Sequence, residues 1–122
     1  MQDNLHIIHY VYIIEVITST VTLYKIGYSS NVIKRAESFK NPEKPSSQVK
    51  GTGIIIKSIR ILATTMFSNE AKAIQYERYM HNKYKLYKYI GKPVLPSGNT
   101  EVYSYNINEI ELNNKHSIFK QH

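Results

Sequence analysis

The sequence predicts a single α+β domain in which one small sheet packs with helices. Three segments, at residues 6–16, 21–28 and 54–65, are rich in the β-branched and aromatic side chains that favour strands. Two others, at residues 32–39 and about 70–87, have apolar side chains at helical spacing. A chain of 122 residues suits one compact domain better than two. We therefore expect one domain over residues 1–122, with its core at about 6–107.

The first two strands should form an antiparallel hairpin that leads into the first helix. The polar residues 18–20 interrupt the strand pattern, which resumes at Val21. Gly27 follows in the second strand, where glycine permits a positive φ or a close backbone approach. Ser29, Ser30 and Asn31 then supply side-chain oxygens that can cap the helix at 32–39.

The second half of the chain should add a strand and the longest helix. The proline- and glycine-containing segment 41–53 predicts an exposed loop, after which residues 54–65 form the third strand. Ser68 or Asn69 caps a helix from about Glu70 to about Tyr87. Beyond a turn-rich connection, residues 100–105 predict a short extended piece and residues 108–112 a helical turn.

Composition excludes several classes of function. The chain has no cysteine, so disulfides, zinc fingers and thiolate chemistry are excluded, and any metal must bind oxygen or imidazole. No apolar run approaches the roughly 20 residues of a membrane-spanning helix. The first residues lack the basic flank and cleavage site of a secretory signal. We expect an intracellular protein without a membrane partner.

The charge of the chain is concentrated in its middle. The net charge is +7, and residues 25–92 alone carry +10, from fourteen basic and four acidic side chains. Clustered lysine and arginine attract polyanions, so this distribution modestly favours a nucleic acid as the partner, although a merely soluble basic protein would look similar. The candidate DNA-contacting side chains are the lysines beside and within the first long loop: Lys34, Lys40, Lys44 and Lys50.

Two short motifs resemble those of the GIY-YIG endonuclease superfamily. They are Tyr10-Val11-Tyr12 in the first strand and Lys25-Ile26-Gly27 in the second, as in the phage and large-DNA-virus subgroup with Lys-Ile-Gly in place of Tyr-Ile-Gly. The resemblance spans residues 10–105. It implies a three-stranded antiparallel sheet flanked by helices, and a DNA endonuclease that hydrolyses phosphodiester bonds with Mg²⁺ or Mn²⁺. A viral member would act in the cytoplasm or nucleus of a host cell.

The resemblance assigns catalytic roles to three side chains near the hairpin. The phenol of Tyr12 would help to activate the attacking water, and because an ordinary phenol has a pKa near 10, a cation such as Lys25 must assist it. Arg35, one of only three arginines, would fork onto a phosphate oxygen near the helix start. The alternatives are a core tyrosine, an edge-strand lysine and a solvated arginine.

Glu77 is the remaining catalytic candidate and the expected metal ligand. It falls within the apolar stripe of the long helix, which consists of Ala73, Tyr76, Met80, Tyr84 and Tyr87. A carboxylate there needs a cation, for which Mg²⁺ is the natural choice, and the resemblance makes it the single protein ligand. A structural pair with Lys25 or Arg35 is the alternative. The nuclease interpretation requires Glu77 to share one cleft with Tyr12, Lys25 and Arg35.

The sequence also contains three secondary candidates for the site and is compatible with one alternative function. His81 follows Glu77 by one helical turn, while Asn99 and Glu101 resemble the carboxy-terminal element of the phage-type subgroup. Because Lys25 replaces the second motif tyrosine, a catalytically inactive nucleic-acid-binding module of the same fold is the alternative. The sequence leaves open a preference for branched or single-stranded DNA and the pairing of two chains as a homodimer.

Overall fold

The structure, a computed structural model, describes residues 7–39, 55–91 and 102–120, with side chains in the last helix described through residue 113. The elements in chain order are β1 (His9–Thr18), β2 (Thr22–Ser29), α1 (Val32–Phe39), β3 (Ile56–Phe67), α2 (Glu70–Lys83), the 3-10 helix η3 (Lys85–Tyr87), β4 (Val102–Tyr103) and α3 (Ile107–Lys120). The described strands form one antiparallel sheet in the order β3-β1-β2-β4. The predicted α+β class is therefore confirmed.

The sheet has one strand more than the sequence predicted. Val102 and Tyr103 pair with Lys25 and Tyr24 on the outer edge of β2. A pair of only two residues is too short to produce a recognisable alternation, so residues 100–105 were predicted only as an extended piece. The sheet is therefore four-stranded, with β1 in its centre.

Helix α1 has the predicted bounds, whereas α2 and α3 begin close to where they were predicted and end elsewhere. Asn69 caps α2, because its Oδ1 accepts hydrogen bonds from the amides of residues 71 and 72. The helix ends at Lys83, short of Tyr87, and the following residues tighten into η3. At the other end of the chain the predicted helical turn is the 14-residue helix α3.

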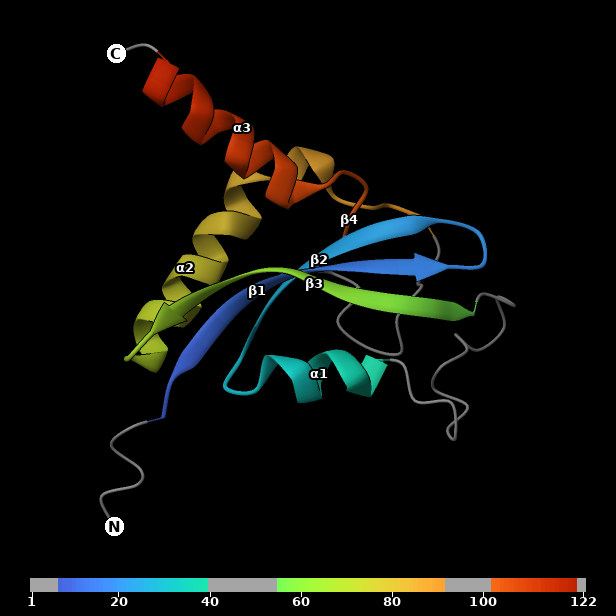
Figure 1. Cartoon of the computed structure of the whole chain (residues 1–122), viewed down its shortest axis with the longest axis horizontal. Helices are drawn as coiled ribbons and strands as arrows, with labels where there is room; N and C mark the ends of the chain where they lie inside the picture. Colours follow the sequence, from blue (N-terminus) through green and yellow to red (C-terminus); the bar gives the residue numbers. More distant parts are fainter. Residues whose placement is uncertain (1–6, 40–54, 92–101, 121–122) are drawn as a thin grey trace.

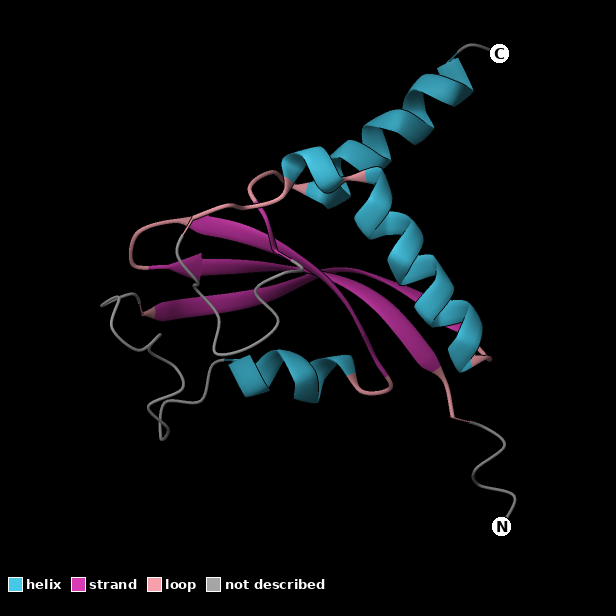
Figure 2. Ribbon diagram, turned by 180° about the vertical axis from the view of Figure 1, so that it is seen from behind, coloured by secondary structure: helices cyan, strands magenta, loops and turns pink. Residues whose placement is uncertain are grey.

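The two faces of the sheet pack against different helices. On one face Tyr12, Ile14 and Val16 of β1 pack with Val32 and Phe39 of α1. Residues of the opposite parity pack on the other face with α2 and with the start of α3: Val11, Ile13, Ala73, Met80 and Ile107. Figures 1 and 2 show α1 below the sheet, with α2 and the start of α3 on the other side and the rest of α3 projecting away from the sheet. The sheet thus separates α1 from α2.

Helix α3 is joined to the end of α2 by one carboxylate. Glu111 accepts a hydrogen bond of 2.6 Å from the Lys83 ammonium and a second one from the Tyr84 hydroxyl. Burial, followed by the hydrogen bond and the charge of Glu111, raises the pKa of Tyr84 above its ordinary value. None of the described helices is both long enough and apolar enough to cross a bilayer.

Candidate nucleic-acid interface

The connection from β2 to α1 is fixed by short polar side chains. The Ser29 hydroxyl accepts a hydrogen bond of 3.0 Å from the Asn31 amide, and Asn31 Oδ1 accepts one of 3.1 Å from the Lys34 amide. Asn31 therefore caps α1, as the sequence predicted for residues 29–31. The remaining amides of the first turn give this end of the helix a partial positive charge.

A hollow of about 380 Å³ lies beside this helix start. We call it the α1 hollow, and its lining residues are Ser29, Ser30, Asn31, Lys34, Arg35 and Ser38. Lys34 and Arg35 are both exposed. The Arg35 guanidinium lies 4.9 Å from the centre of the Phe39 ring, an attraction that favours one orientation of the side chain. Two cations, three hydroxyls and a helix amino end together form a surface suited to a phosphate.

Two further candidates, Tyr12 and Lys25, lie on the face of the sheet that α1 covers. Tyr12 is paired with Gly27 across the hairpin, and a β-carbon at Gly27 would overlap the Tyr12 phenol. The Lys25 ammonium lies 5.5 Å from the centre of the Phe39 ring, on which Arg35 also packs. Tyr12 is 1% exposed and Lys25 is fully buried. The structure therefore brings Tyr12, Lys25 and Arg35 to one face, with only Arg35 at the surface.

Glu77 lies on the opposite face, so the convergence expected from the sequence is not found. It is half-buried on α2, and its Oε2 is 3.4 Å from His81 Nε2. His81 Nδ1 in turn hydrogen-bonds the Tyr103 hydroxyl, and the two rings stack with centres 5.7 Å apart. The carboxylate is accommodated by a histidine one helical turn away, which explains how it can lie in the stripe without Lys25 or Arg35 beside it.

A second polar contact on the α2 face was missed in the sequence. The Tyr28 hydroxyl donates a hydrogen bond of 2.7 Å to Glu70, and His9 Nδ1 lies 2.9 Å from the same hydroxyl oxygen. Burial raises the pKa of Tyr28 to about 12, assisted by the hydrogen bond to Glu70 and by the charges of Glu70 and Glu77. The Tyr28 hydroxyl therefore keeps its proton at neutral pH and acts as a hydrogen-bond donor. The signal in the sequence that could have indicated this contact is the spacing of Glu70 and Glu77, which lie two helical turns apart on the helix face that meets the strand tyrosine.

The described residues offer little to a metal ion. Within 7–39, 55–91 and 102–113, no group of three or more histidine, aspartate or glutamate side chains is placed to bind one. Glu77 and His81 supply two donors, on the face away from the α1 hollow. The remaining candidates of the sequence lie outside the described residues: Lys40, Lys44, Lys50, Asn99 and Glu101.

Comparison with known proteins corrects the family suggested by the motifs. A family model for the T5orf172 domain matches residues 9–112, from β1 into α3. This is a different family from the GIY-YIG superfamily, so the resemblance inferred from the two triplets was wrong. No curated protein and no solved structure gives a significant match.

Packing in the hairpin explains why the triplets were misleading. Tyr12 lies directly opposite Gly27, and only a residue without a β-carbon leaves room for the phenol. Such a tyrosine and glycine pair can arise in any hairpin that places an aromatic ring across the neighbouring strand, so its specificity for one family is low. The longer match over residues 9–112 carries the assignment, and the chain therefore belongs to the T5orf172 domain family.

Proposed function

We propose that this protein is a DNA endonuclease that holds the sugar–phosphate backbone in the α1 hollow. The observation that carries the proposal is the pairing of exposed Lys34 and Arg35 with the start of α1 in a hollow of about 380 Å³. T5orf172 domains are found in phage and nuclease-like proteins, which supports a nucleic-acid partner. The net charge of +10 over residues 25–92 favours the same class of partner.

The chemistry of binding follows from the side chains of the α1 hollow. The Arg35 guanidinium can donate two parallel hydrogen bonds to one phosphate, and Lys34 adds a second positive charge. Hydroxyls of Ser29 and Ser30 and the first-turn amides can donate to the remaining oxygens. None of these groups reads a base edge in a groove, so the expected binding is strongly salt-dependent and weakly sequence-dependent.

Cleavage is the second part of the proposal; because Glu77 lies across the sheet, it no longer rests on the four-residue site expected from the sequence, but on the family and on Tyr12 and Lys25. Both side chains lie on the face that carries the α1 hollow, where an ammonium could stabilise negative charge developing on a phosphate. Because both are buried, they would contribute only in a conformation that brings their polar ends to the substrate. Their catalytic roles stay predictions from the sequence.

A requirement for Mg²⁺ or Mn²⁺ is part of the proposal, without a ligand assigned to it. Hard divalent ions are commonly held by one or two carboxylates together with water and substrate phosphates. Glu77 is a suitable donor by chemistry, but the sheet lies between it and the α1 hollow. Glu77 therefore does not fit as the ligand of an ion that serves a phosphate bound there.

A non-catalytic nucleic-acid-binding domain is the second candidate function. It is favoured by the separation of Glu77 from Arg35 and by the burial of Tyr12 and Lys25. Both candidates predict the same backbone binding, so binding cannot distinguish them. Turnover can, because only an endonuclease produces new strand ends.

The test of cleavage incubates the purified protein with plasmid, branched and single-stranded DNA, with Mg²⁺ or Mn²⁺ and then with a chelator. The endonuclease proposal expects chelator-sensitive products, whereas intact DNA in every condition would leave the binding domain as the function. Cleavage by the Glu77→Ala variant shows whether the face of the sheet that α2 covers takes part in catalysis. If cutting survives in this variant, the sequence-based role of Glu77 as the metal ligand is refuted.

The test of binding compares two arginines by fluorescence anisotropy over a range of salt concentrations. Arg35→Ala should weaken binding and reduce the slope of log affinity against log salt by about 1, since one phosphate contact is lost. Arg78→Ala is the matched control, because Arg78 is also exposed but lies on α2. Equal effects of the two substitutions would argue against the α1 hollow as the DNA site.

A further inference from the structure

We propose that a single nucleobase binds in a second hollow that adjoins the α1 hollow. This hollow has a volume of about 390 Å³, and we call it the Tyr10 pocket. Its lining residues are Tyr10, Ser30, Asn31, Val32, Ile33, Ile61 and Thr64. The inference rests on the proposed function and extends it, because it specifies what form of DNA the protein accepts.

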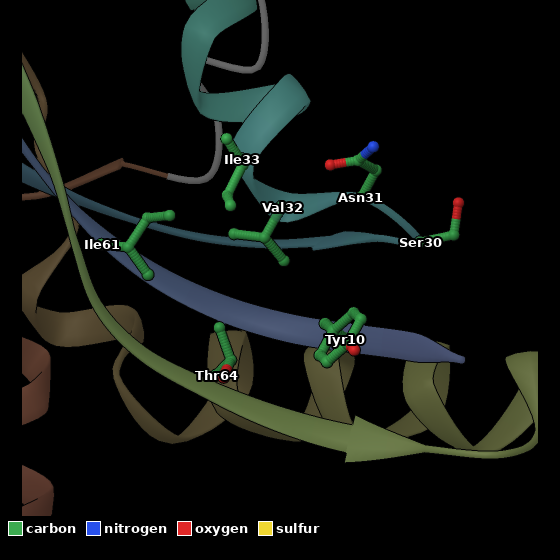
Figure 3. Close-up of a pocket in the computed structure, with 7 residues that line it drawn as sticks. All are labelled: Tyr10, Ser30, Asn31, Val32, Ile33, Ile61 and Thr64. Atoms are coloured by element: carbon green, nitrogen blue, oxygen red, sulfur yellow. The ribbon is translucent and has the colours of Figure 1, made fainter. Parts of the chain in front are cut away.

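The walls of the Tyr10 pocket suit a flat, uncharged ring. Figure 3 shows Val32 and Ile33 at the start of α1 on one side, and Tyr10 of β1 with Ile61 and Thr64 of β3 facing them. Aromatic and aliphatic side chains are the surfaces on which bases stack, irrespective of base identity. None of the described residues that line the pocket is acidic or basic, so these walls offer a charged ligand no partner.

The rim of the pocket adds a limited number of polar groups. The polar side chains among its described lining residues are those of Tyr10, Ser30, Asn31 and Thr64, and Asn31 Oδ1 is already engaged as the cap of α1. A few polar groups around an apolar hollow are typical of small-ligand sites, and 390 Å³ is at the small end of their usual range of about 300–1,000 Å³. The size therefore suits one base with its sugar better than a larger ligand.

The position of the pocket identifies the occupant as part of a nucleotide. Ser30 and Asn31 line both hollows, so the two are contiguous around the start of α1. One side presents Lys34 and Arg35 to an anion, and the other presents Tyr10 to an apolar ring. A nucleotide joins a phosphate and a base through one sugar, so one residue of DNA can occupy both hollows.

The arrangement has a consequence for the substrate. A base inside a duplex is stacked and paired, and it must be extruded before it can enter a pocket. Extrusion requires a few kcal/mol for a paired base and least for a base that is mismatched or already single-stranded. We infer that the protein prefers DNA with an unpaired base at the bound phosphate, such as single-stranded or branched DNA.

The experiment separates the base from the phosphate. Two fluorescein-labelled oligonucleotides are compared by anisotropy with a chelator present: a single strand with bases, and a strand of equal length built from abasic residues. The unmodified protein should bind the strand with bases about tenfold more tightly, since stacking one base on an aromatic side chain contributes roughly that factor. This comparison needs no substitution.

Variants then locate the binding of the base. Thr64→Phe fills the pocket and should reduce affinity for the strand with bases to that for the abasic strand, while leaving the abasic strand unaffected. Thr22→Phe is the matched control, because Thr22 is also an exposed strand threonine but lies at the opposite end of β2 from Ser29. Tyr10→Phe keeps the ring and should retain the preference. Thermal unfolding confirms that each variant is folded.

The outcomes distinguish the pocket from the proposed function. Equal binding of the two strands by the unmodified protein, or no effect of Thr64→Phe, overturns the base pocket. If Arg35→Ala still weakens the binding of both strands in that case, the backbone site stands without the pocket. If the unmodified protein binds neither strand, both the pocket and the proposed function are overturned.

Discussion

Replacing Gly27 by alanine tests the packing that produced the misleading motif. Gly27 lies opposite Tyr12 in the hairpin, and an added methyl group would occupy the space of the Tyr12 phenol. Tyr12 is 1% exposed and belongs to the core on the α1 face, so moving its ring would disturb the surrounding core side chains. The substitution should therefore overpack the core.

The magnitude follows from two opposing contributions. Overpacking a well-packed core costs about 1–3 kcal/mol, which includes any rotation of the phenol away from its preferred rotamer. The loss of glycine stabilises the folded state by about 0.4–1 kcal/mol through the unfolded chain. We expect Gly27→Ala to lower the free energy of unfolding by about 1–2 kcal/mol, or to lower Tm by several degrees in a domain of this size.

The assay is urea unfolding followed by circular dichroism, with a double-mutant cycle as its control. Tyr12→Leu removes the ring and should itself destabilise the protein, but in that background Gly27→Ala should have little effect. The difference between the effects of Gly27→Ala with and without the Tyr12 ring measures the steric conflict directly. If Gly27→Ala is equally harmful with and without the ring, the conflict does not involve Tyr12. A variant as stable as the unmodified protein would refute the packing argument altogether.

Three further predictions address other parts of the molecule. Arg35→Lys should keep the salt dependence of DNA binding but reduce affinity several-fold, because the charge is preserved and the planar fork is lost; equal affinity would show that the fork is unused. Between about pH 10 and 12 the unfolded state releases a proton that Tyr28 retains in the folded state, so stability should fall as pH rises through this range. Tyr28→Phe should make that fall less steep in pH-dependent unfolding, and an unchanged profile would contradict the role of Tyr28. Glu111→Gln weakens the contacts of α3 with Lys83 and Tyr84 and should destabilise the docking of α3 by about 1 kcal/mol. Amide exchange should then accelerate in α3 and not in the sheet.

Local signals in the sequence were sufficient for most of the fold. Enrichment in β-branched and aromatic residues on both sides of a polar interruption placed the hairpin, and Asn69 and residues 29–31 supplied the caps that begin α2 and α1. The pairing of Val102 and Tyr103 with β2 was not predictable, because two residues carry no period and their partners are distant in sequence. The end of α2 was also overestimated, since the apolar spacing continues to Tyr87 although the hydrogen-bonding pattern changes at Tyr84.

The candidate site was only partly predictable for a different reason. Tyr12 and Lys25 do lie on the face of the sheet that α1 covers, which is the part of the expected convergence that the structure contains. The side on which α2 packs depends on the path of the chain after β3, and periodicity contains no information about it. Glu77 was therefore correctly placed in the apolar stripe of its helix, but that helix packs on the face of the sheet opposite to the one expected. The Tyr10 pocket arises from residues distant in sequence, such as Tyr10 and Thr64, and has no linear signature, whereas the described lining of the α1 hollow lies within residues 29–38.

The central position of β1 affects how the chain can be made in a cell. During synthesis β1 can pair with β2 as soon as the hairpin emerges, but its other edge must wait for β3, which ends at Phe67. At about 5–20 residues per second, that interval is roughly 2–8 s. Throughout it, a hydrophobic strand presents unpaired backbone groups to neighbouring nascent chains. Yield on expression should therefore depend on ribosome spacing and chaperone supply more than on the equilibrium stability of the finished domain.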